Sequence, residues 1–321
     1  MTGRNDLEPL LDHLSGRPFF QPHYFHGWRV TPVSGGANNL IYRATDVTTD
    51  LAVKFTLRDA RNRAEREYQA LTALQRLGLH LAPAPVWLES DRYPHPVVVQ
   101  EWLAGEVLTA PPQTDAAWER LLQLCNKVHS VTPEMTRRPI KAAVFGSSSP
   151  AEAKQLVFKQ ADLIPQPARP TELRVLLKTL ASASTPDVEA EHVLCHVDAN
   201  VGNFIVRSGE LYAVDWEGSG WSDPAFEMAN LMTHPAYLSV SRSRWEWVVS
   251  TYTELSRADA VAERIGAYHP ILVVFWVVRL ARTLYEVPRG LDERLVHRPD
   301  DWQEDAEKKY QHYLTLAETL F

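Results

Sequence analysis

The sequence predicts an α+β protein with a small, β-rich N-terminal lobe and a larger, mostly helical C-terminal lobe. Between residues 28 and 57, short runs rich in Val, Ile and aromatic residues alternate with turn residues, as in a small sheet. From residue 114 onward, apolar residues recur at steps of three and four, as in amphipathic helices. Residues 192–217 interrupt the helical pattern with short apolar runs, which we expect to form a hairpin around a polar loop.

Length, composition and charge limit the classes of protein to which the chain can belong. Its 321 residues, of which 45% are hydrophobic, suffice for a sizeable core in two lobes. We expect an N-terminal lobe at 1–103 and a C-terminal lobe at 104–321. The net charge of −7 argues against a nucleic-acid partner and is compatible with a cationic small-molecule substrate. The oligomeric state is left open.

Cysteine usage and apolar runs bear on the compartment. Cys125 and Cys195 lie too far apart for a metal or redox motif, which indicates a reducing compartment. The first residues lack the basic stretch and apolar core of a signal peptide. The longest apolar run, 271–278, is far shorter than the ~20 residues that a bilayer-spanning helix needs. We therefore expect a soluble, cytoplasmic protein with no membrane partner.

Hydrophobic periodicity places the elements of the N-terminal lobe. Residues 5–14 carry leucines on one face and predict a short helix, and residues 59–77 predict a second helix. Four strands are expected at 28–33, 40–44, 51–55 and 96–103. An extended connector is expected at 82–88.

The polar loop within residues 192–217 holds the side chains best suited to chemistry. His196, Asp198 and Asn203 follow the pattern His-x-Asp-x-x-x-x-Asn. With Asp215 twelve residues later, this is the spacing of a kinase catalytic loop and its metal-binding Asp. Asp198 would orient the acceptor hydroxyl and take its proton, while His196 would hold the shape of the loop. Asn203 and Asp215 would offer hard oxygen ligands to Mg²⁺. A polar loop without a chemical role is the alternative.

Three features of the N-terminal lobe suit a nucleotide. Gly35 and Gly36 stand at a strand-to-strand turn, where backbone N–H groups can approach a phosphate closely; an ordinary hairpin is the alternative. Lys54 is central in its strand and would contact the α- and β-phosphates, unless it faces solvent. Glu67 is an acid on an otherwise apolar helix face and needs a partner, which is either Lys54 or a surface Arg.

The motifs within residues 192–227 resemble those of the aminoglycoside phosphotransferase and choline kinase family of small-molecule kinases. The polar loop ends in Gly202-Asn203, and the next strand runs into Asp215-Trp216-Glu217, like the Asp-Trp-Glu or Asp-Phe-Glu of that family. A small-Asp-Pro-aromatic-acid segment follows at 222–227, with Glu227 where Asp is usual. Residues 35–42 match the family's Gly-Gly-x-x-Asn-x-x-Tyr loop, and the resemblance extends from about 28 to 290.

The resemblance implies a bilobal, protein-kinase-like fold with ATP and Mg²⁺ as cofactors. It also implies that the carbonyl of Glu101 and the N–H of Leu103 hold the adenine between the lobes. Because these are main-chain groups, side-chain identity there does not distinguish ATP from GTP.

The C-terminal lobe offers the candidates for binding the acceptor. Trp276 and Arg279 lie on a polar stripe of a very apolar helix, and this stripe either lines a cleft or faces solvent. Glu217 is a third candidate. Residues 131–170 are expected to be irregular. Helices are expected at 117–128, 171–182, 225–233, 242–255, 270–287 and 302–321.

The predicted function is a kinase that uses Mg-ATP to phosphorylate a hydroxyl group of a small molecule. An aminoglycoside-phosphotransferase-like enzyme is the first interpretation. The alternative is a choline- or ethanolamine-type amino-alcohol kinase, because aromatic faces attract quaternary amines and the chain has ten Trp. A non-catalytic, nucleotide-binding pseudokinase is the alternative of another class. The presence of Lys54, Asp198, Asn203 and Asp215 together argues against it.

Overall fold

The computed structural model describes residues 4–16, 18–33, 39–137, 139–186, 190, 192–258 and 260–321. The chain forms two compact units. Unit 1 comprises Met1–Val107, Asn203–Ser219 and Arg294–Arg298, and unit 2 comprises Leu108–Gly202, Gly220–Glu293 and Pro299–Phe321. The expected lobe boundary at 103/104 stays a prediction about domains. The compact units change at 107/108, and the second half of the predicted hairpin belongs to unit 1.

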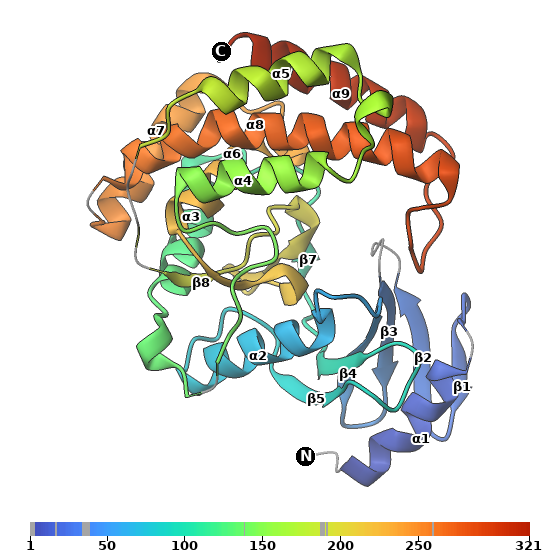
Figure 1. Ribbon diagram of the computed structural model, residues 1–321. Helices are drawn as coiled ribbons and strands as arrows, with labels where there is room; N and C mark the ends of the chain where they lie inside the picture. The colour runs from blue at the N-terminus through green and yellow to red at the C-terminus, as the bar shows by residue number, and fades with distance from the viewer. Residues whose placement is uncertain are drawn as a thin grey trace. The chain divides into compact units, whose positions relative to one another are not determined.

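Unit 1 is built on an antiparallel sheet of six strands in the order β1-β2-β3-β4-β6-β5 (Figure 1). The leucines of helix α1 (Arg4–Ser15) are buried in the core with one face of the sheet, which confirms the predicted N-terminal helix. Helix α2 (Arg63–Arg76) follows β4. The strands are β1 (His23–Phe25), β2 (Trp28–Val33), β3 (Asn39–Thr45), β4 (Asp50–Thr56), β5 (Pro85–Glu89) and β6 (Val97–Glu101).

A smaller sheet completes unit 1. It has the order β10-β9-β7, with β7 at Glu106–Val107, β9 at Phe204–Arg207 and β10 at Glu210–Ala213. Glycine is required at position 105, because a Cβ there would lie 2.5 Å from the side chain of Ile205. The N–H of Ala213 donates to the carbonyl of Leu81 over 2.8 Å, which fastens the β9–β10 hairpin to the segment after α2.

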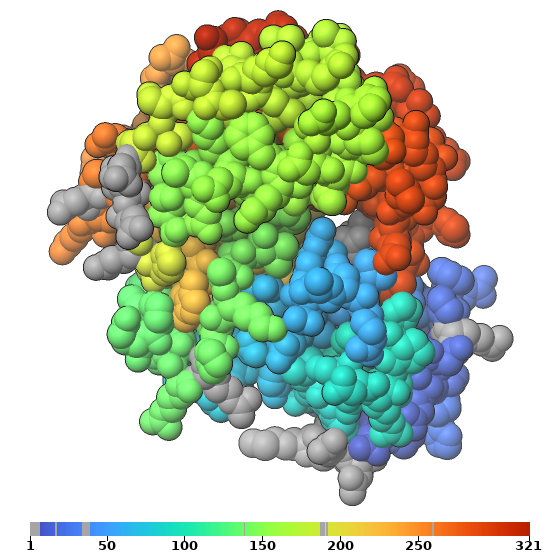
Figure 2. All heavy atoms as spheres, in the orientation of Figure 1, coloured from blue at the N-terminus to red at the C-terminus, as the bar shows by residue number. Residues whose placement is uncertain are grey.

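Unit 2 is mostly helical, as predicted. Its central helix α8 (Val261–Glu286) contacts α4, α5, α6, α7 and α9, and Figure 1 shows α4, α5 and α9 running alongside it. In the space-filling view, α4 and α5 form a continuous green to yellow-green surface of this unit (Figure 2). The other helices are α3 (Asp115–His129), α4 (Pro150–Ala161), α5 (Thr171–Ser182), α6 (Pro224–Thr233), α7 (Arg242–Ser256) and α9 (Trp302–Glu318).

Several expected elements differ from the structure. Strand β8 (Val193–Cys195) pairs with β11 (Gly220–Ser222) instead of joining the β9–β10 hairpin. The segment 131–170, expected to be irregular, contains helix α4. Helix α8 begins nine residues before Pro270. By length and composition Val261–Arg289 could cross a membrane, but 61% of its most apolar window is buried inside the protein, as in a core helix.

Candidate active site

Lys54 is the centre of a buried charge cluster in unit 1. Its side chain is only 3% exposed, and its Nζ lies 2.7 Å from Glu67 Oε2. The same Nζ also donates to Asp215 Oδ1 and lies 3.5 Å from Glu217 Oε2. The predicted ion pair between Lys54 and Glu67 is therefore present, and the surface-Arg alternative for Glu67 is wrong. Strand β4 supplies the lysine, α2 supplies Glu67, and the segment after β10 supplies the other two acids.

Burial and charge act in opposite directions on this cluster. Burial would lower the pKa of Lys54, but the charges of Asp215 and Glu67 raise it well above its ordinary value, so the amine stays protonated. Burial raises the pKa of Glu67 to about 7, although the charge of Lys54 opposes this. The Lys54 amine thus faces three carboxylates, those of Glu67, Asp215 and Glu217.

The carboxylate of Glu217 is held by residues of unit 1. It accepts a hydrogen bond from Asn39 Nδ2 over 2.8 Å, and its other oxygen pairs with Arg63 Nη1 at the start of α2. Arg63 also pairs with Asp59 at 3.2 Å. Glu217 therefore links the loop after β10 to both α2 and β3. These partners all belong to unit 1, as do Lys54 and Glu67, whereas the sequence pattern suggested an acceptor contact.

Asn203 and Asp215 fit a hard cation. The N–H of Val214 donates to the carbonyl of Asn203 over 2.9 Å, so the two residues stand at the same end of the β9–β10 ladder. Asp215 has a left-handed backbone, with φ of 65°, which turns the chain sharply after β10. The side-chain amide of Asn203 is buried, and its Nδ2 has no hydrogen-bond partner among the described residues. The side-chain oxygens of Asn203 and Asp215 are hard ligands of the kind that Mg²⁺ would use, whereas the amide nitrogen is not a ligand.

The segment after β6 leaves a main-chain donor unused. The N–H groups of Glu101 and Trp102 are bonded to the carbonyls of Ala84 and Asp50, respectively. The N–H of Leu103 makes no hydrogen bond to any other residue that the structure describes. The expected use of Leu103 N–H by adenine is compatible with this arrangement and stays a prediction.

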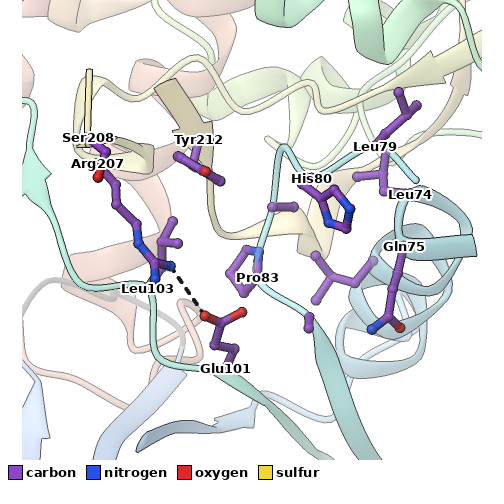
Figure 3. A pocket seen from close by; sticks show the side chains of 13 residues that line it. Leu74, Gln75, Leu79, His80, Pro83, Glu101, Leu103, Arg207, Ser208 and Tyr212 are labelled. Atoms are coloured by element: carbon purple, nitrogen blue, oxygen red, sulfur yellow. Dashed lines mark hydrogen bonds and ion pairs between the residues drawn. The ribbon is translucent and has the colours of Figure 1, made fainter. Parts of the chain in front are cut away.

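A cavity of about 390 Å³ lies in unit 1 beside this segment, between α2, the start of β5 and the β9–β10 hairpin (Figure 3). The side chains of Glu101 and Leu103 line it, and Glu101 Oε1 pairs with Arg207 Nη1 at 3.3 Å. Their predicted contacts with adenine use main-chain atoms, so the cavity is not evidence for those contacts.

In unit 2, the loop that carries His196 and Asp198 is held by Glu227 of α6. The Glu227 carboxylate accepts hydrogen bonds from the N–H groups of His196 (3.1 Å) and Val197 (3.2 Å). Val197 has a φ of 58°, a left-handed conformation that is costly for a β-branched residue. The Asn230 side chain donates to the Val197 carbonyl over 2.9 Å. Helix α6 thus fixes a strained loop conformation.

Two buried residues, His129 and Tyr252, orient Glu227. His129 Nε2 lies 2.9 Å from Glu227 Oε2, and His129 Nδ1 lies 2.6 Å from the Tyr252 hydroxyl. Burial alone would raise the pKa of Glu227, but the hydrogen bond and charge of His129 hold it below its ordinary value. Cys195 could complete a group of three metal donors with His129 and Glu227. Because His129 and Glu227 are already bonded to each other, we assign the group to holding the loop.

Asp198 itself is half-buried, and its Oδ1 accepts a hydrogen bond from the N–H of Asn200 over 3.1 Å. His196 is buried, which agrees with a structural function for this side chain. Both residues belong to unit 2, whereas Asn203, Asp215 and Lys54 belong to unit 1.

The remaining predicted site residues are of three kinds. Gly35 and Gly36 lie outside the described residues. Trp276 stacks on Tyr313, with ring centroids 5.8 Å apart, and its Nε1 is buried without a partner in the described part of the chain. Arg279 is exposed, and its guanidinium lies over the ring of Trp276 at 5.6 Å. A contact of Trp276 or Arg279 with the acceptor stays a prediction.

Comparison with known proteins places this geometry in a family. A model described as the phosphotransferase enzyme family matches residues 29–244. A structure assigned as an aminoglycoside phosphotransferase from Ralstonia eutropha JMP134 is 15% identical, covers 97% of both chains and has a TM-score of 0.68. Choline kinase from Cryptosporidium parvum Iowa II is 13% identical over 98% of this chain and 96% of that chain, with a TM-score of 0.64.

The GDP complex of aminoglycoside 2'-phosphotransferase-IIIa is also similar, with 16% identity over 98% of this chain and 99% of that chain and a TM-score of 0.63. Because the family model matches well over half of its length, the chain belongs to the phosphotransferase enzyme family. It is a small-molecule phosphotransferase by class, and the predicted family and kinase-like α+β fold are confirmed.

Two sets of supporting residues were missed by the sequence reasoning. Arg63 binds Glu217, and the only signal for it was an acid, Asp59, four residues earlier. Asp223, recognised as part of a motif, is fully buried and pairs with Arg264 at 3.0 Å. Arg264 precedes the part of α8 that the sequence predicted, so no local signal pointed to this pair.

Proposed function

We propose that this chain transfers the γ-phosphoryl group of ATP to a hydroxyl group of a small molecule, with Mg²⁺ as the metal. The observation that carries the proposal is the buried lysine in strand β4. Lys54 is paired at once with Glu67 of α2 and with Asp215 after β10. A lysine held in this way can bind phosphate oxygens and keep its charge. We place the enzyme in the cytoplasm.

Each residue has a defined task in the proposal. Lys54 binds the α- and β-phosphates, and Glu67 keeps its amine in place. Asn203 and Asp215 would hold Mg²⁺, which supplies positive charge to the phosphates when it is bound. The carbonyl of Glu101 and the N–H of Leu103 would hold the base, and Gly35 and Gly36 would cover the phosphates.

On the acceptor side, Asp198 accepts the proton of the attacking hydroxyl and orients it toward the γ-phosphorus. Proximity and orientation supply most of the rate, because phosphoryl transfer asks for little covalent chemistry from the protein. Glu227 and His129 keep the loop of Asp198 in its strained shape and touch no reactant. We assign Glu217 to the nucleotide side, because Asn39, Arg63 and Lys54 surround it.

The acceptor is proposed to be aminoglycoside-like, with an amino alcohol such as choline or ethanolamine as the second candidate. Similar folds include a spectinomycin phosphotransferase in complex with ADP and spectinomycin, and choline kinase LicA from Streptococcus pneumoniae. The acidic net charge of −7 suits a cationic acceptor of either kind.

The test combines turnover with two variants. ATP consumption is measured with a panel of aminoglycosides and amino alcohols, which also separates an active kinase from a pseudokinase. Asp198→Ala is expected to abolish transfer while Mg-ADP affinity, measured by calorimetry, stays within about twofold of wild type. Asp215→Ala is expected to weaken Mg-ADP binding itself by about tenfold or more. Equal loss of nucleotide affinity in both variants would contradict the assigned roles.

A further inference from the structure

Gln100 is a buried polar residue of unit 1 to which neither the fold nor the proposed chemistry gives a task. It stands near the end of β6, directly before Glu101. In the antiparallel ladder of β4 and β6, Gln100 is opposite Ala52 and Val98 is opposite Lys54. Residues opposite each other, and residues two apart along a strand, project from the same face of a sheet. Gln100 therefore projects from the same face as Lys54.

The side-chain oxygen of Gln100 is buried and unsatisfied. The residue is only 6% exposed, and its Oε1 has no hydrogen-bond partner among the described residues. Its neighbours on that face, Ala52 and Val98, have apolar side chains that cannot bond to it. Buried polar atoms are almost always hydrogen-bonded, and an orphaned one costs free energy. An unfilled acceptor at this place points to a ligand that brings a donor.

The neighbouring main-chain groups indicate which kind of ligand would fit. The N–H of Leu103, three residues on, is unused in the described part of the chain, whereas those of Glu101 and Trp102 are bonded within the fold. Lys54 on the same face suits the phosphates. A ligand with phosphates near Lys54 and a base near residues 100–103 would present the edge of the base to Gln100.

We propose that Gln100 makes this enzyme select adenine over guanine nucleotides, by accepting a hydrogen bond from the 6-amino group of the base. Adenine carries an N–H donor at position 6, whereas guanine and hypoxanthine carry a carbonyl oxygen there. In the orientation that the structure gives the Gln100 amide, its oxygen is satisfied by the 6-amino donor, whereas a 6-carbonyl group would place a second acceptor against it. This inference rests on the proposed nucleotide site and extends it, because main-chain contacts alone leave the choice of purine open.

The first test uses the wild-type protein and needs no variant. Affinities for ADP, IDP and GDP, each with Mg²⁺, are measured by calorimetry. IDP differs from ADP in having a 6-oxo group and a proton on N1, and it lacks the 2-amino group of GDP. The ratio of ADP to IDP therefore tests this edge of the base, and the Gln100 variant below separates position 6 from N1. We expect ADP to bind about tenfold more tightly than IDP, the effect of one buried hydrogen bond and one avoided mismatch. Equal or tighter binding of IDP overturns the proposal, whereas failure of all three nucleotides to bind overturns the proposed function instead.

The second test identifies the residue. Gln100→Met keeps the volume of the side chain and removes both amide atoms. The ADP-to-IDP ratio is expected to fall toward one, through weaker ADP binding and unchanged or tighter IDP binding. The control is Gln123→Met, the same replacement at an exposed position of α3, which should leave the ratio at its wild-type value. A wild-type ratio in Gln100→Met would assign purine selection to another residue and reject Gln100.

Discussion

Glu217 illustrates how the neighbours of a residue define its task. Its position two residues after the proposed metal ligand Asp215 left its contacts open at the level of sequence. In the structure one oxygen meets Arg63 and the other meets Asn39. Arg63 is 5% exposed, so its buried charge needs the pairing that this carboxylate and that of Asp59 supply. Glu217 therefore supports α2, which in turn carries Glu67 to Lys54.

The variant Glu217→Gln tests this assignment. It is expected to weaken Mg-ADP binding by about tenfold, because the loss of one charged hydrogen bond leaves Arg63 partly unpaired and loosens α2. The KM for the acceptor should be unchanged. The control is Glu246→Gln, which breaks an exposed pair with Arg242 and should affect neither quantity. A raised acceptor KM with normal nucleotide affinity would restore the acceptor role predicted from sequence.

At the level of elements, α6 controls the loop of Asp198 through one carboxylate. Because the folded pKa of Glu227 lies below its ordinary value near 4.5, ionisation of this group favours the folded state. The stabilisation of the folded state by this ionisation is therefore present above pH 4.5 and is lost as the pH falls through the lower, folded pKa. Part of the acid sensitivity of unit 2 should therefore come from this single group.

We expect Glu227→Gln to lower the free energy of unfolding by about 3 kcal/mol at pH 7, since His129 loses its buried partner. The difference from wild type should shrink as the pH falls through the folded pKa of the wild-type carboxylate, which lies below 4.5. Urea unfolding of both proteins from pH 3 to pH 7 measures this. A difference that is constant with pH would show that the ionised form of Glu227 contributes no stability.

A separate measurement asks whether Glu227 positions the loop. Glu227→Asp keeps the charge but is one methylene shorter, so it cannot reach both His129 and the two loop N–H groups. Its kcat is expected to fall about tenfold, while Mg-ADP affinity stays normal, because Asp198 is misplaced and the nucleotide residues of unit 1 are untouched. Full activity of Glu227→Asp would mean that the loop keeps its shape without this contact.

Local periodicity predicted most elements, but it could not predict long-range pairing. The leucines of α1 and the steps of three and four in α3 and α7 are signals within one element, and these helices were found. Strand β8 pairs with β11, which begins 25 residues after β8 ends. No property of Val193–Cys195 distinguishes β11 from β9 as its neighbour.

The errors in unit 2 have physical causes of the same kind. Proline is common at the first turn of a helix, and for this reason the predicted helix began at Pro270. In the structure, packing of α8 against five other helices compensates for the lost N–H, so the helix runs through Pro270. Within the candidate site, the charges of Lys54, Glu67 and Asp215 could be anticipated, because motifs have fixed spacing. Arg63 and His129 could not, because their partners are distant in sequence.

At the scale of the whole molecule, the predicted site residues come from both compact units. The chain leaves unit 2 at Gly202, forms the β9–β10 hairpin and the Asp215 turn in unit 1, and returns to unit 2 at Gly220. Asp198 and Asp215 are therefore held by different units, although only a short stretch separates them along the chain. Nucleotide binding is assigned to residues of unit 1, and the general base that takes the proton of the acceptor, Asp198, belongs to unit 2.

This division predicts where a bound nucleotide should slow hydrogen exchange. At 100 times its dissociation constant, Mg-ADP should stabilise the folded state by about 2.7 kcal/mol. We expect protection to appear in residues 50–56 and 203–219, which hold Lys54, Asn203 and Asp215, because binding suppresses local opening there. Helices α5 and α9 of unit 2 should exchange at unchanged rates. Hydrogen–deuterium exchange with mass spectrometry measures both regions in one experiment, and Asp215→Ala is the control that should lose the protection. Protection confined to α5 and α9 would contradict the assignment of nucleotide binding to unit 1.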